Sequence, residues 1–299
     1  MTIYSQISAN RQKTYLIFAL FIALLTGFFY LIGLYYGDGN GYLVLGLVIS
    51  TVTTFFSYFY SDKLVLMSVG AVPANKRDHF DLYTATENMA MAAGLPMPKV
   101  YVINDPAPNA FATGRDPKHA VVCATTGLLS MMDRGELEGV VAHEVSHIKN
   151  FDILVMTITS VLVGTISLVA DWILRSLWWG GRRDSSDRDS GRNPLTLILL
   201  LLALIIAPLT ATLIQLAISR KREYLADASA ALLTRRPVAL ASALEKISGY
   251  PRPMRSANTA TAHMFISNPL RKHTKGDWFA GLFSTHPPVA ERIRILRSL

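Results

Sequence analysis

Cysteine and charged residues are both scarce in this sequence. Cys123 is the single cysteine among 299 residues, so the chain cannot form an internal disulfide, which fits a reducing compartment. Charged residues make up 17% of the chain, whereas a typical soluble domain has about 25%. The deficit comes from long windows without any charge, and this pattern favours a membrane protein.

Four uncharged, apolar windows are candidates for membrane-spanning helices. A helix needs about 20 apolar residues to cross a hydrocarbon core of about 30 Å. Three windows reach this length, and the third is marginal with 18 residues. The alternative, a buried core helix of a soluble protein, stays open mainly for the third and fourth windows. The windows are residues 14–36, 42–61, 153–170 and 194–219.

Positive residues predict the orientation of these helices. Arg11 and Lys13 precede the first window, the turn after it has no positive charge, and Lys63 begins a basic stretch after the second window. The positive-inside rule therefore predicts cytoplasmic termini and a cytoplasmic region between the two hairpins. Residues 180–193 would then lie outside although they contain arginines. Either this loop is translocated or the second hairpin does not span the membrane, and we expect two spans.

The net charge of +8 does not by itself indicate a nucleic-acid partner. The positive residues are spread over the loops between apolar windows and form no basic patch interleaved with aromatic residues. The positive-inside bias of membrane proteins accounts for the excess. We therefore expect the lipid bilayer as a partner, and no nucleic acid.

The charged stretches predict a mainly α fold with a small β-sheet (α+β). One helix should end at Gly94, and another should begin at Asp133, because Asp133 and Glu136 form a capping-box pattern. Two further helices should follow the last apolar window, and a short one should lie near the end of the chain. Strands are expected over residues 98–105 and 119–126, with a short strand in NAFAT between them.

The stretch VVAHEVSHIKN, residues 140–150, contains the pattern HExxH. On a helix, His143 and His147 lie on one face and can offer two imidazoles to one metal ion. Glu144 can then act as general base on a water molecule at the metal. Two imidazoles, a carboxylate and one open water position are a known catalytic zinc arrangement. Two ordinary helix histidines are the alternative, which the lack of a third ligand would favour.

The stretch KREYLAD, residues 221–227, offers a third ligand. Glu223 and Asp227 share one face of a predicted helix, so Glu223 can bind the metal while Asp227 accepts the free N–H of a metal-binding histidine. A surface glutamate paired with Arg or Lys is the alternative for Glu223. His147 and Glu223 both lie within about 10 Å of an apolar window if their helices continue. Two helices that leave the same membrane face can therefore meet at one metal ion.

Other polar residues keep open or ordinary roles. Asn150 and Asp152 follow the HExxH helix and either end it or support a ligand, and the sequence does not decide between these roles. The remaining histidines show no ligand spacing, and we expect them to be ordinary. They are His79, His119, His263 and His273.

Four motifs in the order NAFATG, HEVSH, REYLAD and THPPVAERI resemble those of the HtpX family of bacterial membrane zinc metallopeptidases. The type I CAAX prenyl protease is a more distant relative. The resemblance implies a gluzincin-type peptidase domain fused to four transmembrane helices, with one zinc ion held by His143, His147 and Glu223. Glu144 would be the general base, and Asp227 would fix a zinc-binding histidine.

Further roles rest on the resemblance alone. His286 would donate a hydrogen bond to the oxyanion of the transition state, with Arg292 as its support. NAFATG would form an edge strand to which a substrate backbone adds as a further strand. The expected substrate contacts are Asn109, Ala110, Phe111 and Ala112.

The resemblance also implies a function and a division of the chain. Such an enzyme would cleave damaged, misassembled or unfolded membrane proteins on the cytoplasmic side of the bacterial inner membrane as part of a stress response. A zinc-stabilised membrane scaffold or adaptor without turnover is one alternative, and a prenyl-protein-type processing protease is another. The expected parts are a membrane hairpin (1–62), a first catalytic part (63–152), a second apolar hairpin (153–219) and a second catalytic part (220–299).

Overall fold

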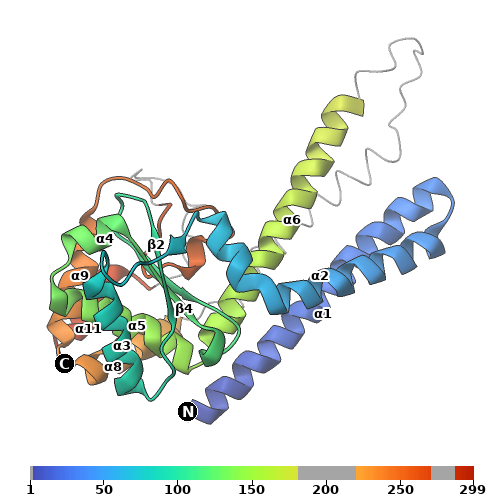
Figure 1. Ribbon diagram of the computed structural model, residues 1–299. Coiled ribbons are helices and arrows are strands. Elements are labelled where there is room, and N and C mark those ends of the chain that lie inside the picture. The colour runs from blue at the N-terminus through green and yellow to red at the C-terminus, as the bar shows by residue number, and fades with distance from the viewer. Residues whose placement is uncertain (1–2, 181–219, 271–286) are drawn as a thin grey trace.

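The computed structural model describes residues 3–180, 220–270 and 287–299. Two long helices, α1 (Ile3–Tyr36) and α2 (Gly39–Ser68), form a hairpin that projects away from the sheet-containing part of the molecule, and α6 (Asp152–Gly180) leaves on the same side (Figure 1).

Three of the described helices are long and apolar enough to cross a membrane. Their candidate spans are Ile7–Leu34, Gly39–Ser68 and Asp152–Val169, so the first three expected windows are all helical. The fourth expected window, residues 194–219, lies outside the described residues.

The hairpin and α6 pack together through apolar side chains. Phe21 and Phe28 of α1 belong to the same buried cluster as Ile158 and Leu162 of α6. Within the hairpin the two helices approach closely at Gly46, where an added Cβ would come within 2.6 Å of the Phe29 Cβ. Small residues permit such close contact between membrane helices, where no water is released by association.

A four-stranded mixed sheet lies in the order β1-β2-β4-β3. The pair β2–β4 is parallel, whereas β1–β2 and β3–β4 are antiparallel. The strands expected from the sequence are present, including the short one in NAFAT, and β3 lies at an edge. β1 was not expected. The strands are β1 (Val72–Pro73), β2 (Lys99–Ile103), β3 (Ala110–Thr113) and β4 (Val121–Thr125).

Helix α5 (Arg134–Lys149) is the central helix of this part of the molecule. It packs against α3, α8, α9 and β3, and Val140, Ala142 and Val145 along it are fully buried. The expected capping box is present, because Asp133 accepts from the Glu136 N–H at 2.8 Å and Glu136 accepts from the Asp133 N–H at 2.9 Å. The other helices are α3 (Phe80–Ala93), α4 (Thr126–Met131), α8 (Arg220–Thr234), α9 (Pro237–Gly249), α11 (Val289–Leu296), η1 (Pro117–His119) and η2 (Ala262–Met264).

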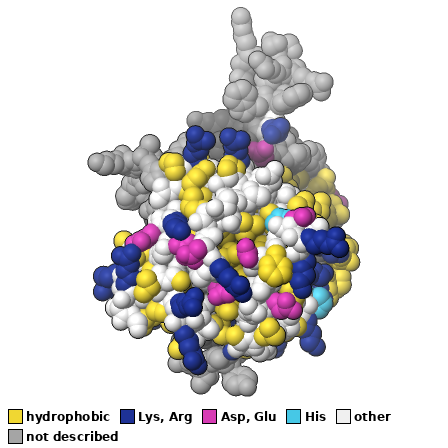
Figure 2. All heavy atoms as spheres, turned by 60° about the vertical axis from the view of Figure 1, so that its left-hand side comes forward, with side chains coloured by type: hydrophobic (Ala, Val, Ile, Leu, Met, Phe, Trp, Pro, Cys, Tyr) yellow, Lys and Arg dark blue, Asp and Glu magenta, His cyan; other side chains and the backbone are white. Residues whose placement is uncertain are grey.

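The expected mainly α fold with a small β-sheet is confirmed. Helix α3 ends where expected, with Gly94 in the left-handed region at a φ of 70°, which a glycine adopts without the penalty that a Cβ would bring. On the face of the molecule in Figure 2, the described Lys and Arg side chains are interspersed with Asp and Glu and form no continuous positive patch.

The capping box yields a stability prediction. Asp133→Ala removes the acceptor for a backbone N–H in the first turn of α5, so the free energy of unfolding should fall by about 1 kcal/mol. Denaturant unfolding in mild detergent measures this, with the neighbouring Arg134→Ala as the matched control. Equal stability of the two variants would show that the cap does not stabilise α5.

Candidate metal centre

Three side chains from α5 and α8 converge in the interior of the sheet-containing part of the molecule. His143 and His147 come from α5 and Glu223 comes from α8, and one donor atom of each lies within 4.8 Å of the others. The two Nε2 atoms are 3.2 Å apart. The Glu223 carboxylate lies 3.4 Å from Nε2 of His147 and 3.8 Å from Nε2 of His143.

This spacing fits a zinc ion. Four ligands at about 2.0–2.1 Å from a tetrahedral zinc lie about 3.3–3.4 Å from one another. The measured separations of 3.2, 3.4 and 3.8 Å are close to that value. The three side chains are at most 4% exposed. Their donor atoms therefore approach one another in the interior, away from water.

The charge balance of the centre also fits a divalent cation. Four carboxylates at or next to the donors are at most 3% exposed, and the guanidinium groups of Arg222 and Arg292 bond to two of them. If all four are ionised, two negative charges remain, which equals the charge of one divalent cation. Burying charge without such compensation is costly. The four carboxylates belong to Glu144, Asp152, Glu223 and Asp227.

Each imidazole is held by a carboxylate on its outer nitrogen. The Nδ1 atom of His143 lies 2.9 Å from Asp227, and that of His147 lies 3.0 Å from Asp152. A carboxylate in this place accepts the Nδ1–H, which fixes the tautomer and leaves the Nε2 lone pair for the metal. Asp227 therefore lies where the helix spacing predicted. Asp152, whose role the sequence left open, contacts His147 in the same way.

Arg292 is fully buried and holds Asp227 with two bonds. Its Nε and Nη2 atoms donate to the two carboxylate oxygens at 2.8 and 2.7 Å, and its Nη1 atom donates to the Ile266 carbonyl at 2.9 Å. Burial opposes ionisation, but the Arg292 guanidinium lowers the pKa of Asp227 to about 2. The expected support of His286 by Arg292 stays a prediction, because His286 lies outside the described residues.

Glu144 lies beside the donors with an unused oxygen. It is 2% exposed, and its Oε1 has no hydrogen-bond partner among the described residues. Burial raises the pKa of this carboxyl to about 7, with Glu223 adding to the rise and His147 and the Ala112 backbone N–H opposing it. A cation among the donors would also oppose the rise. The unused Oε1 atom at this place is suited to accept a proton.

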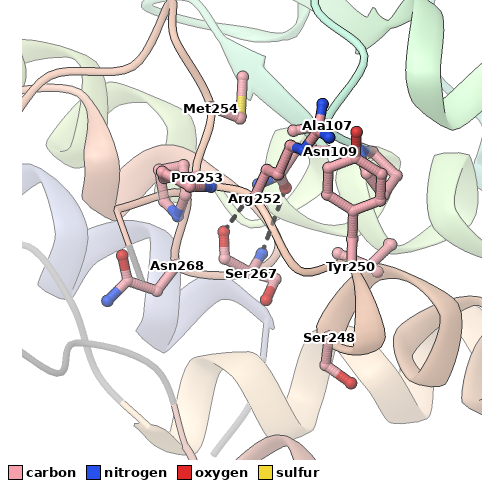
Figure 3. Close-up of a pocket in the computed structure, with 12 residues that line it drawn as sticks. Ala107, Asn109, Ser248, Tyr250, Arg252, Pro253, Met254, Ser267 and Asn268 are labelled. Carbon is pink, nitrogen blue, oxygen red and sulfur yellow. Dashed lines mark hydrogen bonds between the residues drawn. The ribbon is translucent and has the colours of Figure 1, made fainter. Parts of the chain in front are cut away.

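The expected substrate-contact residues are buried around β3. Asn109, Ala110, Phe111 and Ala112 are at most 3% exposed. The Ala110 carbonyl accepts from the Ile266 N–H at 2.9 Å. The Asn109 amide donates to the Ser267 carbonyl at 2.9 Å and accepts from the Ser267 N–H at 3.4 Å, beside a small pocket (Figure 3).

The outer edge of β3 is therefore partly occupied by the chain's own backbone at Ile266, and the next residue, Ser267, bonds to the side chain of Asn109. A substrate strand would have to pair near Ala112, whose N–H points toward Glu144, or displace this segment. The substrate-binding role of residues 109–112 stays a prediction.

Two residues that sequence reasoning did not single out contact Asp152. Asn10 of α1 donates to its Oδ1 atom at 2.8 Å, and Arg222 of α8 donates to the same atom at 3.1 Å. Arg222 is the first residue of the REYLAD motif, whereas Asn10 stands in no recognisable motif. Asn10 lies four positions before the first apolar window, so no signal in the sequence indicated this contact.

Comparisons with known proteins identify the family of the chain. The model of "Peptidase family M48" matches residues 76–299. A "Protease HtpX homolog" of Caldanaerobacter subterraneus subsp. tengcongensis is 50% identical over 305 residues, covering 100% of this chain and 98% of that protein. One of Thermoanaerobacter pseudethanolicus is 48% identical over 299 residues, with the same coverage, and one of Pyrococcus furiosus is 47% identical over 289 residues, covering 96% and 95%.

A solved structure shares the fold. The crystal structure of S. mikatae Ste24p matches with a TM-score of 0.51 at 20% identity, covering 98% of this chain and 66% of that one. At this identity, the similarity concerns the fold alone.

The donor set yields a prediction on metal content. Glu223→Ala removes one of three donors, so the purified variant should retain less than about a tenth of the bound divalent metal of the native protein. Elemental analysis after dialysis measures this, and Glu138→Ala on the outer side of α5 is the control. Native metal content in Glu223→Ala would remove this residue from the ligand set.

Proposed function

The chain belongs to peptidase family M48 and is a membrane protease of the HtpX type, and from this premise we propose that it is a zinc-dependent endopeptidase. The convergence of His143, His147 and Glu223 on one point, with the free Glu144 oxygen beside it, carries this proposal. A zinc-stabilised scaffold has no need of a buried carboxylate with an unused oxygen at the metal, so Glu144 favours an enzyme.

The proposed mechanism uses the chain's own residues in fixed positions. A bound zinc ion supplies Lewis-acid polarisation of the scissile carbonyl and lowers the pKa of water. Glu144 accepts the proton of the attacking water and delivers it to the leaving amine. We assign the stabilisation of the developing oxyanion to His286. Asp227 and Asp152 keep both imidazoles in the tautomer that leaves Nε2 free.

The proposed site of action is the membrane surface. His147 precedes the candidate span Asp152–Val169 by five positions, and at 1.5 Å per helical residue the centre lies within about 10 Å of the span's start. We propose membrane proteins that are damaged, misassembled or unfolded as substrates, because such chains expose extended backbone next to the bilayer. A role in the stress response belongs to the same proposal.

The proposed topology places the catalytic parts, residues 63–152 and 220–299, in the cytoplasm of a bacterial cell, together with both termini. The hairpin 1–62 and the second apolar hairpin 153–219 would anchor them in the cell membrane. The distribution of Lys and Arg around the first hairpin supports this orientation.

Glu144→Gln tests the proposed base. The variant keeps the shape and the three metal donors, so it should bind metal like the native protein while cleavage of casein falls by a factor of about 10²–10⁴. Zinc content and cleavage in detergent are measured on the same preparations, with Glu138→Gln of α5 as the control. Full cleavage by Glu144→Gln would refute the assignment of this base.

The single buried cysteine permits a direct test of topology. Cys123 is 0% exposed, and burial raises the pKa of its thiol, so it should not react with a membrane-impermeant maleimide.

Introduced thiols report their side of the membrane. Asn40→Cys, in the exposed first turn of α2, should be labelled from outside intact cells, whereas Lys118→Cys on η1 should be labelled only after permeabilisation. The reverse pattern would contradict the proposed orientation.

A further inference from the structure

Asn10 is a buried polar residue of the first membrane helix. It is 3% exposed and lies in the candidate span Ile7–Leu34, outside residues 76–299 that match the family model. A polar side chain within a membrane helix is costly unless its hydrogen bonds are made. The partners of Asn10 therefore indicate why an asparagine is present here.

The Asn10 amide is bonded in a single orientation. Its Nδ2 donates to the Asp152 carboxylate at 2.8 Å and to the Asn150 carbonyl at 2.9 Å. Its Oδ1 accepts from Nη1 of Arg222 at 2.9 Å. Both N–H donors and the oxygen are used, so a flipped amide, or a carboxylate of the same shape, would place oxygen against oxygen.

The two acceptors of Asn10 flank a strained turn. Phe151 connects α5 and α6 with a φ of 59°, a conformation rare for a residue with a side chain. Such a conformation is strained and persists when the surroundings hold it. Asn10 bonds to Asn150 before Phe151 and to Asp152 after it. These two hydrogen bonds therefore bridge the strained turn.

The turn positions a metal-centre carboxylate. The Oδ1 atom of Asp152 accepts the hydrogen bond from Asn10, while its Oδ2 atom lies 3.0 Å from Nδ1 of His147. His147 is thereby supported through Asp152 by the first membrane helix. His143 is supported in the same manner through Asp227 and Arg292, both of which belong to the region matched by the family model.

We infer that Asn10 is a positioning residue of the metal centre, so that the first membrane helix is a structural part of the peptidase site as well as an anchor. This inference rests on the proposed metal-binding function. It implies that displacement of α1 from the α5–α6 turn weakens metal binding, because Asp152 loses a donor and His147 loses part of its orientation.

Asn10→Asp tests the inference with an isosteric change. It replaces two donors by an oxygen that faces the Asp152 carboxylate and the Asn150 carbonyl. Because loss of such support typically weakens metal affinity by a factor of about 10–100, we expect a rise of that size in the zinc dissociation constant. Competition with a chelator measures it on the full-length protein in detergent.

The matched control is Thr14→Val on the same helix. The Thr14 hydroxyl donates to the Asn10 backbone carbonyl within α1, so this variant should keep native affinity. The unfolding temperature of the metal-free proteins separates positioning from folding. A purely structural role for Asn10 would lower this temperature in Asn10→Asp without changing the zinc dissociation constant. If Asn10→Asp does not fold, Asn10→Ala takes its place.

A double-mutant cycle tests whether Asn10 affects metal binding through Asp152. If Asn10 acts through Asp152, the losses of affinity in Asn10→Asp and Asp152→Asn should not add in the double variant, whereas additive losses would overturn the inference. Native affinity in Asn10→Asp would overturn it as well. A native protein without zinc affinity would instead refute the proposed function, so the two failures are distinguishable.

Discussion

The structure depends on two buried imidazoles that must present their Nε2 atoms to the same point. An imidazole is free to rotate and to change tautomer unless a partner fixes its other nitrogen. Here a carboxylate does so on each side, Asp227 for His143 and Asp152 for His147. These carboxylates are themselves buried and need donors of their own, which Arg292, Arg222 and Asn10 supply. The requirement that each buried charge and hydrogen-bonding group has a partner therefore extends from two histidines to five helices, α1, α5, α6, α8 and α11.

The same requirement explains the place of the site next to the membrane helices. Helix α5 passes through a sharp turn at Phe151 directly into α6, so the residue that supports His147 also begins a candidate span. The candidate metal centre and the candidate span of α6 share a few residues instead of being joined by a linker. Helix α8 packs against α5 from the other side and supplies Glu223.

Sequence reasoning predicted what depends on local patterns. The cap at Asp133, the helix end at Gly94, the small sheet and the family were confirmed, because caps, strand alternation and HExxH are short-range signals. β1 was missed, since two residues including a proline carry no strand pattern. The contacts of Asn10 with Asp152, 142 positions away, and of Ile266 with β3 could not be predicted, because they depend on how distant segments pack. The roles of His286 and of residues 109–112 stay predictions.

X-ray absorption spectroscopy at the zinc edge of the purified full-length protein tests the central claim most directly. The account predicts two imidazole nitrogens and carboxylate oxygen at about 2.0–2.1 Å, with the outer-shell scattering of imidazole rings and no sulfur at about 2.3 Å. A sulfur neighbour, or a shell of oxygen atoms without imidazole scattering, would contradict a centre built from His143, His147 and Glu223.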